Sequence, residues 1–251
     1  MNKNIYLYQP AIIEPIKVYE FLKENLSEIG FKIKLYSHYE FLSPEKAHHI
    51  GDFDLKKLKK AGFEEGIESG IIDSFAVSNH ADLSKPDSFV CYLTNEKYVA
   101  PGILSIHLPA VKDIENYQTN VQTIFDELIK LVAPIYGFQS KSKTVYKGIS
   151  YALTGSVFEN ERANFSSYLS GKKKIDKMRM IYEVNYLTNN QLNHKVNGLK
   201  LIELIQKQKD LLTMQKLSKT IHKIECPSEH ILEINKEFGK SGFLVSWYDS
   251  Y

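Results

Sequence analysis

Three groups of residues combine histidine with a thiol or a carboxylate, and each combination could support chemistry. His222, Cys226 and His230 follow one another at intervals of four, which on one continuous helix would line up imidazole and thiolate ligands for zinc. Pro227 opposes this arrangement, because a proline inside a helix removes a backbone hydrogen bond and separates the residues on either side. We therefore expect no metal here, and instead a buried Cys226 at a helix start with histidines that face solvent.

The two other groups place imidazoles near carboxylates. Segment 48–54 holds two adjacent histidines and two aspartates, and His80 lies two residues before Asp82. General acid–base catalysis requires an imidazole that an orienting carboxylate holds beside the reacting group. The enzymatic interpretation is therefore a hydrolase with a dispersed pair such as His80 and Asp82. No nucleophile elbow, phosphate-binding glycine loop, dinucleotide fingerprint or H-E-x-x-H motif occurs, so we expect no cofactor and favour a binding protein.

Hydrophobic periodicity predicts the elements that must carry these residues. Alternating apolar residues predict strands at residues 5–8, 31–36, 89–93, 103–108, 149–153 and 243–248, with 89–93 and 103–108 paired as a hairpin. Apolar residues at intervals of three and four predict helices at 15–29, 115–133, 201–212 and 227–238. The glycine-punctuated stretch 43–74 is expected to be a helical insertion, with one helix opening at 43–45 and another over 54–60.

A central strand is predicted at residues 178–187, where β-forming residues run directly into a polar turn. Thr188 or Asn189 can then cap the helix that follows. Because strands and helices are mixed within each half, we predict an α+β fold with antiparallel sheets backed by helices, of which two ferredoxin-like halves are one form. The predicted halves are residues 1–138, with the insertion near 43–74, and residues 139–251, packed as one compact unit.

The two halves differ in the sign of their charge. Residues 1–138 hold 14 Lys and no Arg against 19 Asp and Glu, a net charge of −5, and residues 139–251 hold 18 basic against 11 acidic residues, a net charge of +7. Such a split serves attraction between the halves, recognition of a charged partner, or solvation alone. Arginine, which nucleic-acid contacts favour, occurs only at positions 162 and 179, so a nucleic-acid partner is not expected.

The cysteine content and the apolar runs bear on the cellular compartment. Only Cys91 and Cys226 occur, without a CxxC pair, so no disulfide framework is predicted. The first residues show no signal-peptide pattern, and no stretch of about 18 apolar residues is present. We therefore expect a cytoplasmic protein without a membrane partner.

Two stretches together resemble a known family. The run FDELIKLVAPIYGF at residues 125–138 and the run IYEVNYL at residues 181–187 are similar to the immunity-protein-52-like domains of bacterial polymorphic toxin systems. In those domains a helix leads into a Pro-x-Tyr-Gly segment and precedes a strand with an Asn-aromatic-Leu ending. Where such families often show tryptophan, this chain has Phe138 and Glu183.

The resemblance implies an α+β protein that binds and neutralises a cognate toxin without chemistry of its own. Such a protein needs a rigid scaffold and a surface patch opposite in charge to its target. The predicted partner-binding residues are the carboxylates of the insertion, Asp52, Asp54, Glu64, Glu65 and Glu68, for which an ordinary solvated loop is the alternative. A structural or phage-associated interaction protein is a third interpretation that the sequence does not separate from an immunity protein.

Overall fold

The computed structural model describes residues 1–10, 15–40, 48–62, 65, 66, 69, 71–94, 102–111, 114–153, 161, 165–169 and 175–247. The chain forms two compact units: unit 1 comprises Met1–Pro134 and Lys141–Ile149, and unit 2 comprises Ile135–Ser140 and Ser150–Tyr251. Both units combine helices with antiparallel strands, which confirms the predicted α+β class. The predicted boundary between residues 138 and 139 falls inside strand β7 (Pro134–Ser142), and the division into those two halves stays a prediction.

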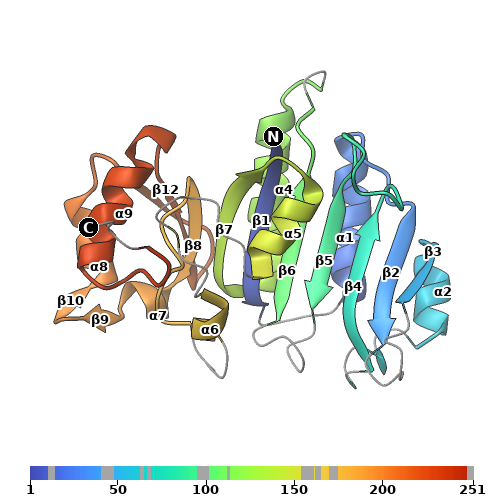
Figure 1. Ribbon diagram of the computed structural model, residues 1–251, viewed down its shortest axis with the longest axis horizontal. Coiled ribbons are helices and arrows are strands. Elements are labelled where there is room, and N and C mark those ends of the chain that lie inside the picture. Colours follow the sequence, from blue (N-terminus) through green and yellow to red (C-terminus); the bar gives the residue numbers. More distant parts are fainter. Residues whose placement is uncertain are drawn as a thin grey trace. The chain divides into compact units, whose positions relative to one another are not determined.

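Unit 1 contains an antiparallel sheet in the order β1-β6-β5-β4-β2-β3 (Figure 1). Its strands are β1 (Asn2–Pro10), β2 (Leu35–Glu40), β3 (His48–Asp52), β4 (Ile72–Ser78), β5 (Val90–Thr94) and β6 (Ile103–Leu108). The predicted hairpin is confirmed, because β5 pairs with β6. In a ferredoxin-like half, one strand lies between the first strand and the strand that follows the first helix. In unit 1 three strands, β6, β5 and β4, lie between β1 and β2, so its strand order differs from the ferredoxin-like one.

The two helices predicted with the clearest periodicity cover one face of this sheet. These helices, α1 (Pro15–Glu28) and α4 (Tyr117–Val132), contact each other and lie on the same side of the strands in Figure 1. Ile5 of β1 lies opposite Ile106 of β6, and both are fully buried. Burial of such apolar pairs beneath helices is the main stabilising term for unit 1.

The opposite face of β1 and β6 is polar and buried. Asn4 lies opposite His107, and the Nδ1 atom of His107 is 3.0 Å from Oδ1 of Asn4. The hydroxyl of Tyr6 donates to the carbonyl of Gly148 in α5 (Val145–Leu153) at 3.1 Å. The strand predicted at 149–153 is therefore wrong: buried positions 145, 148 and 152 recur at helical spacing, and the alternation at 149, 151 and 153 is incidental.

The predicted helical insertion contains a strand as well as a helix. The residues predicted to open a helix at 43–45 lie outside the described part of the chain. Residues 48–52 form β3, which pairs with β2, and α2 (Leu55–Lys60) follows where a helix over 54–60 was predicted. The strand predicted at 31–36 begins only at Leu35, although Lys34 already bonds through its backbone to Ser78 and Phe53 at the sheet margin.

Unit 2 contains an antiparallel sheet in the order β11-β12-β8-β7. Its elements beyond β7 are α6 (Phe165–Leu169), β8 (Val184–Thr188), α7 (Asn189–Leu192), the hairpin β9 (Lys195–Val196) and β10 (Leu199–Lys200), α8 (Leu201–Lys207), β11 (Thr213–Lys216), β12 (Ile221–Glu225), η1 (Ser228–His230) and α9 (Ile231–Lys240). Thr188 caps α7 in a reciprocal arrangement with Gln191, which confirms the predicted cap.

The central strand predicted at 178–187 is only half formed, since β8 begins at Val184. The buried side chain of Asn235 in α9 bonds both the backbone N–H and the carbonyl of Ile181, at 2.7 and 2.8 Å. Asn185 makes two further bonds to the backbone of Tyr182. Met178 forms an isolated bridge with Leu244, and backbone hydrogen bonds join residues 178 and 179 to residues 243, 245 and 246. These contacts replace the strand predicted at 243–248, of which residue 248 lies outside the described part of the chain.

An ion pair lies within the core of unit 2. The Nε atom of Arg179 is 2.6 Å from Oε1 of Glu161, and the side chains are 1% and 0% exposed. The guanidinium also donates to the carbonyl of Tyr151 at 2.6 Å and lies 4.0 Å from the centre of that ring. The hydroxyl of Tyr151 donates to the Glu161 carboxylate, so the Tyr182 hydroxyl donates to Tyr151 at 2.7 Å. This buried network positions the core of unit 2.

Candidate functional site

The predicted partner-binding carboxylates are partly gathered at one end of unit 1. Asp52 ends β3, Asp54 precedes α2, and Glu65 follows α2 on an exposed turn of helix. Glu64 and Glu68 lie outside the described residues. Asp52 and Glu65 are exposed, so their carboxylates are accessible to a partner.

Asp54 has a structural role. Its side chain accepts hydrogen bonds from the backbone N–H groups of Lys56 and Lys57 at 3.0 and 3.3 Å, as a helix N-cap does. Replacing such a cap costs about 1 kcal/mol of stability. A change at Asp54 therefore alters α2 as well as the charge of the surface.

Lysines share this end of unit 1 with the carboxylates. Lys56, Lys57 and Lys60 of α2 are exposed, and Lys59 forms a salt bridge with Glu20 of α1 at 2.8 Å. The sequence indicates the carboxylates as candidates, but that reasoning did not include the lysines of α2, which lies between Asp54 and Glu65. The surface that they form carries both signs of charge.

A row of stacked rings runs across the sheet toward its β3 edge. The ring centres of Phe75 and Tyr36 are 5.9 Å apart, those of Tyr36 and His38 are 5.9 Å apart, and those of His38 and His49 are 4.7 Å apart. Gly51 makes room for this row, because a Cβ at that position would lie 2.7 Å from the Tyr36 ring. His49 thus contributes its imidazole to this stack, and Asp54 accepts a hydrogen bond from the backbone of α2.

A concavity of about 480 Å³ lies between the start of this row and α2. We call it the β2–α2 pocket; it is lined by Tyr36, His38, Leu58, Ala61, Gly62, Glu65, Gly66, Ser69, Ile71 and Ile72. Its size falls within the range typical of ligand sites, and its lining is mostly apolar with a few polar groups. Sequence reasoning found only Glu65 of these residues, because the pocket depends on the pairing of β2 and β4 and on the position of α2.

The other predicted imidazole–carboxylate pair, His80 and Asp82, is not formed. Nε2 of His80 lies 2.9 Å from Oδ2 of Asp87, and this hydrogen bond lowers the pKa of Asp87. Asp82 instead accepts a bond from the backbone N–H of Ser84 at 2.9 Å, and its hydrogen bonds to Ser84 lower the pKa of Asp82. The two aspartates therefore organise the 79–88 loop, and Asp87 is the carboxylate that orients His80.

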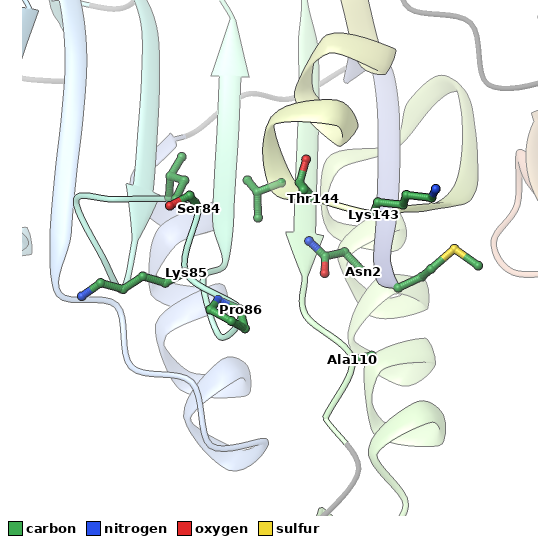
Figure 2. Close-up of a pocket in the computed structure, with 10 residues that line it drawn as sticks. Asn2, Ser84, Lys85, Pro86, Ala110, Lys143 and Thr144 are labelled. Carbon is green, nitrogen blue, oxygen red and sulfur yellow. The ribbon is translucent and has the colours of Figure 1, made fainter.

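A second, smaller concavity of about 210 Å³ adjoins this loop. Its lining includes the side chains of Asn2, Ser84, Lys85, Lys143 and Thr144 (Figure 2). In Figure 2 the ammonium ends of Lys85 and Lys143 point away from the space between Ser84 and Asn2. Its described lining residues include neither histidine nor carboxylate, so the His80–Asp87 pair does not act inside it.

The possible zinc ligands lie on different elements, as Pro227 predicts. His222 lies in β12 and bonds Oδ1 of Asn189 at 2.8 Å, whereas His230 lies in η1 beside Glu233. Cys226 is buried between them, and burial raises the pKa of its thiol to about 11. In the described part of the chain, no group of three or more His, Cys, Asp and Glu could hold a metal ion.

Three other groups with shifted pKa values, His107, Cys91 and Tyr182, are inside the cores. Burial lowers the pKa of His107 to about 3, and this imidazole bonds Asn4 and Ser105 on the polar face of β1 and β6. Burial also raises the pKa of the Cys91 thiol and of the Tyr182 hydroxyl above their usual values. These side chains are at most 2% exposed, so a dissolved substrate does not reach them.

Comparison with known proteins does not assign the chain to a family. No protein-family model and no curated protein matches it. Among solved structures, the Pseudomonas aeruginosa T6SS protein PA0821 aligns with 89% of this chain at 11% sequence identity and a TM-score of 0.49, and the chain covers 64% of that protein chain. So loose an alignment assigns neither fold nor function. Within the described residues, no helix combines the length and the apolar character needed to cross a membrane.

Proposed function

We propose that this chain is a non-enzymatic binding protein of the immunity type, which binds and neutralises a bacterial toxin through one end of unit 1. We call this surface the β3–α2 end; it comprises β3, α2, Glu65 and Ile71. The observation that carries the proposal is the β2–α2 pocket next to exposed charges and exposed apolar residues. The similarity of residues 125–138 and 181–187 to immunity-protein-52-like domains supports the toxin as the class of partner.

The β3–α2 end has the features of a protein-binding surface. Ile50 in β3 and Ile71 before β4 are 57% and 41% exposed, so both are accessible to a partner. β3 is the last strand of the unit 1 sheet among the described residues, so its outer backbone groups can pair with an extended segment. Apolar anchors with charges around them are typical of interfaces, where the anchors supply affinity and the charges supply specificity.

The placement of the reactive groups supports a binding role over the hydrolase. His107, Cys91 and Tyr182 lie in the cores, and His80 is oriented by Asp87 outside the described lining of either concavity. A hydrolase needs its base beside the reacting group in a concave site. The β2–α2 pocket does hold a histidine and a carboxylate, His38 and Glu65, but the His38 ring is stacked with the rings of Tyr36 and His49. The His80–Asp87 pair and the core groups lie outside both concavities, which favours binding over a hydrolase that uses them.

The experiment that tests the proposal is calorimetry with the toxin captured by co-purification with the products of neighbouring genes. The variant Asp52→Lys/Glu65→Lys reverses two exposed charges without touching the α2 cap. We expect the toxin to bind the unaltered chain and to bind this variant at least tenfold more weakly, because like charges at an interface cost several kcal/mol. The control is Glu127→Lys, which reverses an exposed carboxylate in α4 and should leave the affinity for the toxin unchanged.

Circular dichroism and thermal melts must show that each variant is folded. Equal affinity of the charge-reversal variant and the unaltered chain would remove the β3–α2 end from the interface. No complex with any neighbouring gene product would contradict the immunity function itself.

A further inference from the structure

We propose that the β2–α2 pocket binds a long cationic side chain, an arginine or a lysine, that the protein partner presents. This inference rests on the proposed function and specifies the chemistry that the pocket recognises. Three properties carry it: the aliphatic wall, the aromatic rings that extend this wall, and the single carboxylate among the described lining residues.

The wall of the pocket suits the methylene stem of such a side chain. Leu58 of α2 and Ile72 at the start of β4 are buried, and Ile71 beside them is partly exposed. Arginine and lysine bury their stems along apolar surfaces while their charged ends seek polar groups. A wall of this kind holds the stem without hydrogen bonds.

The Tyr36 and His38 rings extend this wall. They lie on the same strand two residues apart, and both are half-buried and line the pocket. Each ring is stacked between neighbours, Tyr36 between Phe75 and His38, and His38 between Tyr36 and His49. The rings therefore pack beside the stem, and the charged end is left to a polar group of the pocket.

Glu65 gives the pocket its charge. Among the lining residues that the structure describes, it is the only Asp, Glu, Lys or Arg. A Cβ placed on Gly62, which also lines the pocket, would lie 3.5 Å from Oε2 of Glu65, so the carboxylate lies beside the lining backbone of Gly62. A cation whose stem lies along the apolar wall can therefore pair with the Glu65 carboxylate of the same pocket.

The lysines of α2 do not line the pocket. Lys56 and Lys60 are each two residues from Leu58, which places them about 200° around the helix from the lining side chain. Lys59 pairs with Glu20 of α1, and Lys57 is exposed beside Leu58. Glu65 is therefore the charged group of the described lining, and its charge is complementary to a cation.

The test is a nuclear magnetic resonance titration of the full ¹⁵N-labelled chain with blocked tripeptides. The probes are acetyl-Gly-Arg-Gly-amide and its lysine, leucine and glutamate counterparts. We expect saturable shifts of the Gly62, Gly66 and Ser69 amides with the arginine or the lysine peptide, and weaker or no shifts with the other two. The stronger of the two cationic peptides identifies the preferred side chain.

Matched variants assign the binding to the pocket. Glu65→Gln should raise the Kd of the cationic peptide about threefold or more, whereas Glu127→Gln in α4, at an exposed pair with Lys130, should leave it unchanged. Equal binding of the leucine peptide, an unchanged Kd in Glu65→Gln, or no saturable shift at the three amides would overturn the inference. If the toxin complex forms but these peptides fail, only the pocket assignment is wrong; if the peptides bind but no toxin complex forms, the proposed function is wrong.

Discussion

The buried pair of Arg179 and Glu161 allows a prediction whose size follows from the structure. Both side chains are excluded from water, and the carboxylate also accepts the hydroxyl of Tyr151 at 2.8 Å. In Glu161→Gln the guanidinium keeps its position but loses the neutralising charge. Leaving one partner of a buried pair uncompensated costs about 3–5 kcal/mol. For a chain of this length that corresponds to a fall in Tm of roughly 6–20 °C.

Removing Arg179 should lower the free energy of unfolding as much as neutralising Glu161, whereas removing both charges should lower it less. Arg179→Met leaves a buried carboxylate unpaired and should also cost about 3–5 kcal/mol. The double variant Arg179→Met/Glu161→Leu removes both charges and leaves the Tyr151 hydroxyl bonded to the Tyr182 hydroxyl. Its remaining cost is the buried Tyr151 carbonyl that loses the guanidinium, about 1–3 kcal/mol. We therefore expect the double variant to be more stable than either single variant.

The chain contains a single tryptophan, which makes the assay specific for unit 2. Trp247 is 6% exposed and forms an isolated bridge with Glu161, so its fluorescence reports on unfolding around the pair. Urea titrations followed by this fluorescence give the free energy of unfolding for each variant. The control is Glu127→Gln, whose exposed pair with Lys130 should contribute less than about 1 kcal/mol.

The reasoning would be refuted if both single variants lost less than about 1 kcal/mol, the value of an exposed pair. It would also be refuted if the losses of the two single variants simply added in the double variant, because a direct ion pair requires strong coupling between the two positions.

Three further outcomes are expected. His107 is neutral in the folded chain because burial lowers its pKa to about 3, whereas the unfolded imidazole takes up a proton below about pH 6.5. The free energy of unfolding should therefore fall by about 1.4 kcal/mol per pH unit from pH 6.5 towards pH 3. Urea titrations at pH 5, 6 and 7 should show that this pH dependence disappears in His107→Gln. Gly148→Ala should lose about 1–3 kcal/mol although alanine favours helix, because its Cβ would lie 2.9 Å from Cε1 of His107; a melt equal to or higher than that of the unaltered chain would contradict the packing. Asp54→Ala should cost about 1 kcal/mol and Asp54→Asn almost nothing in thermal melts, and equal losses in the two variants would show that the side chain does not cap α2.

The elements predicted from sequence with most success are those whose burial pattern is local. α1, α4 and α9 repeat apolar residues at helical spacing, and each buries that stripe. The β5–β6 hairpin follows from two apolar runs close in sequence. For these elements the periodicity and the tertiary contacts favour the same structure.

The elements predicted wrongly depend on residues far away in sequence. Residues 178–183 alternate like a strand, but Asn235, more than fifty positions later, bonds the backbone of Ile181 and replaces a neighbouring strand. β3 has the sequence HHIGD, which shows no apolar alternation, and it forms because β2 offers a pairing edge. Its Gly51 accommodates the Tyr36 ring, a constraint that periodicity does not contain.

Some residues of the candidate site could also be predicted from the sequence, and others could not. Charge counting finds Asp52 and Glu65, because exposed carboxylates are visible in the sequence. The aliphatic wall and the Tyr36–His38 surface depend on the pairing of strands that are separated by the whole insertion. Asp54 also differs from the other carboxylates because it caps α2, and charge alone does not indicate this role.

The most direct test of the central claim is survival of cells that express the toxin encoded beside this chain. Co-expression of the unaltered chain should restore growth, and co-expression of Asp52→Lys/Glu65→Lys at the same level should not, because the reversed charges weaken the complex. Failure of the unaltered, folded chain to restore growth, or equal protection by both, would contradict an immunity protein that acts through the β3–α2 end.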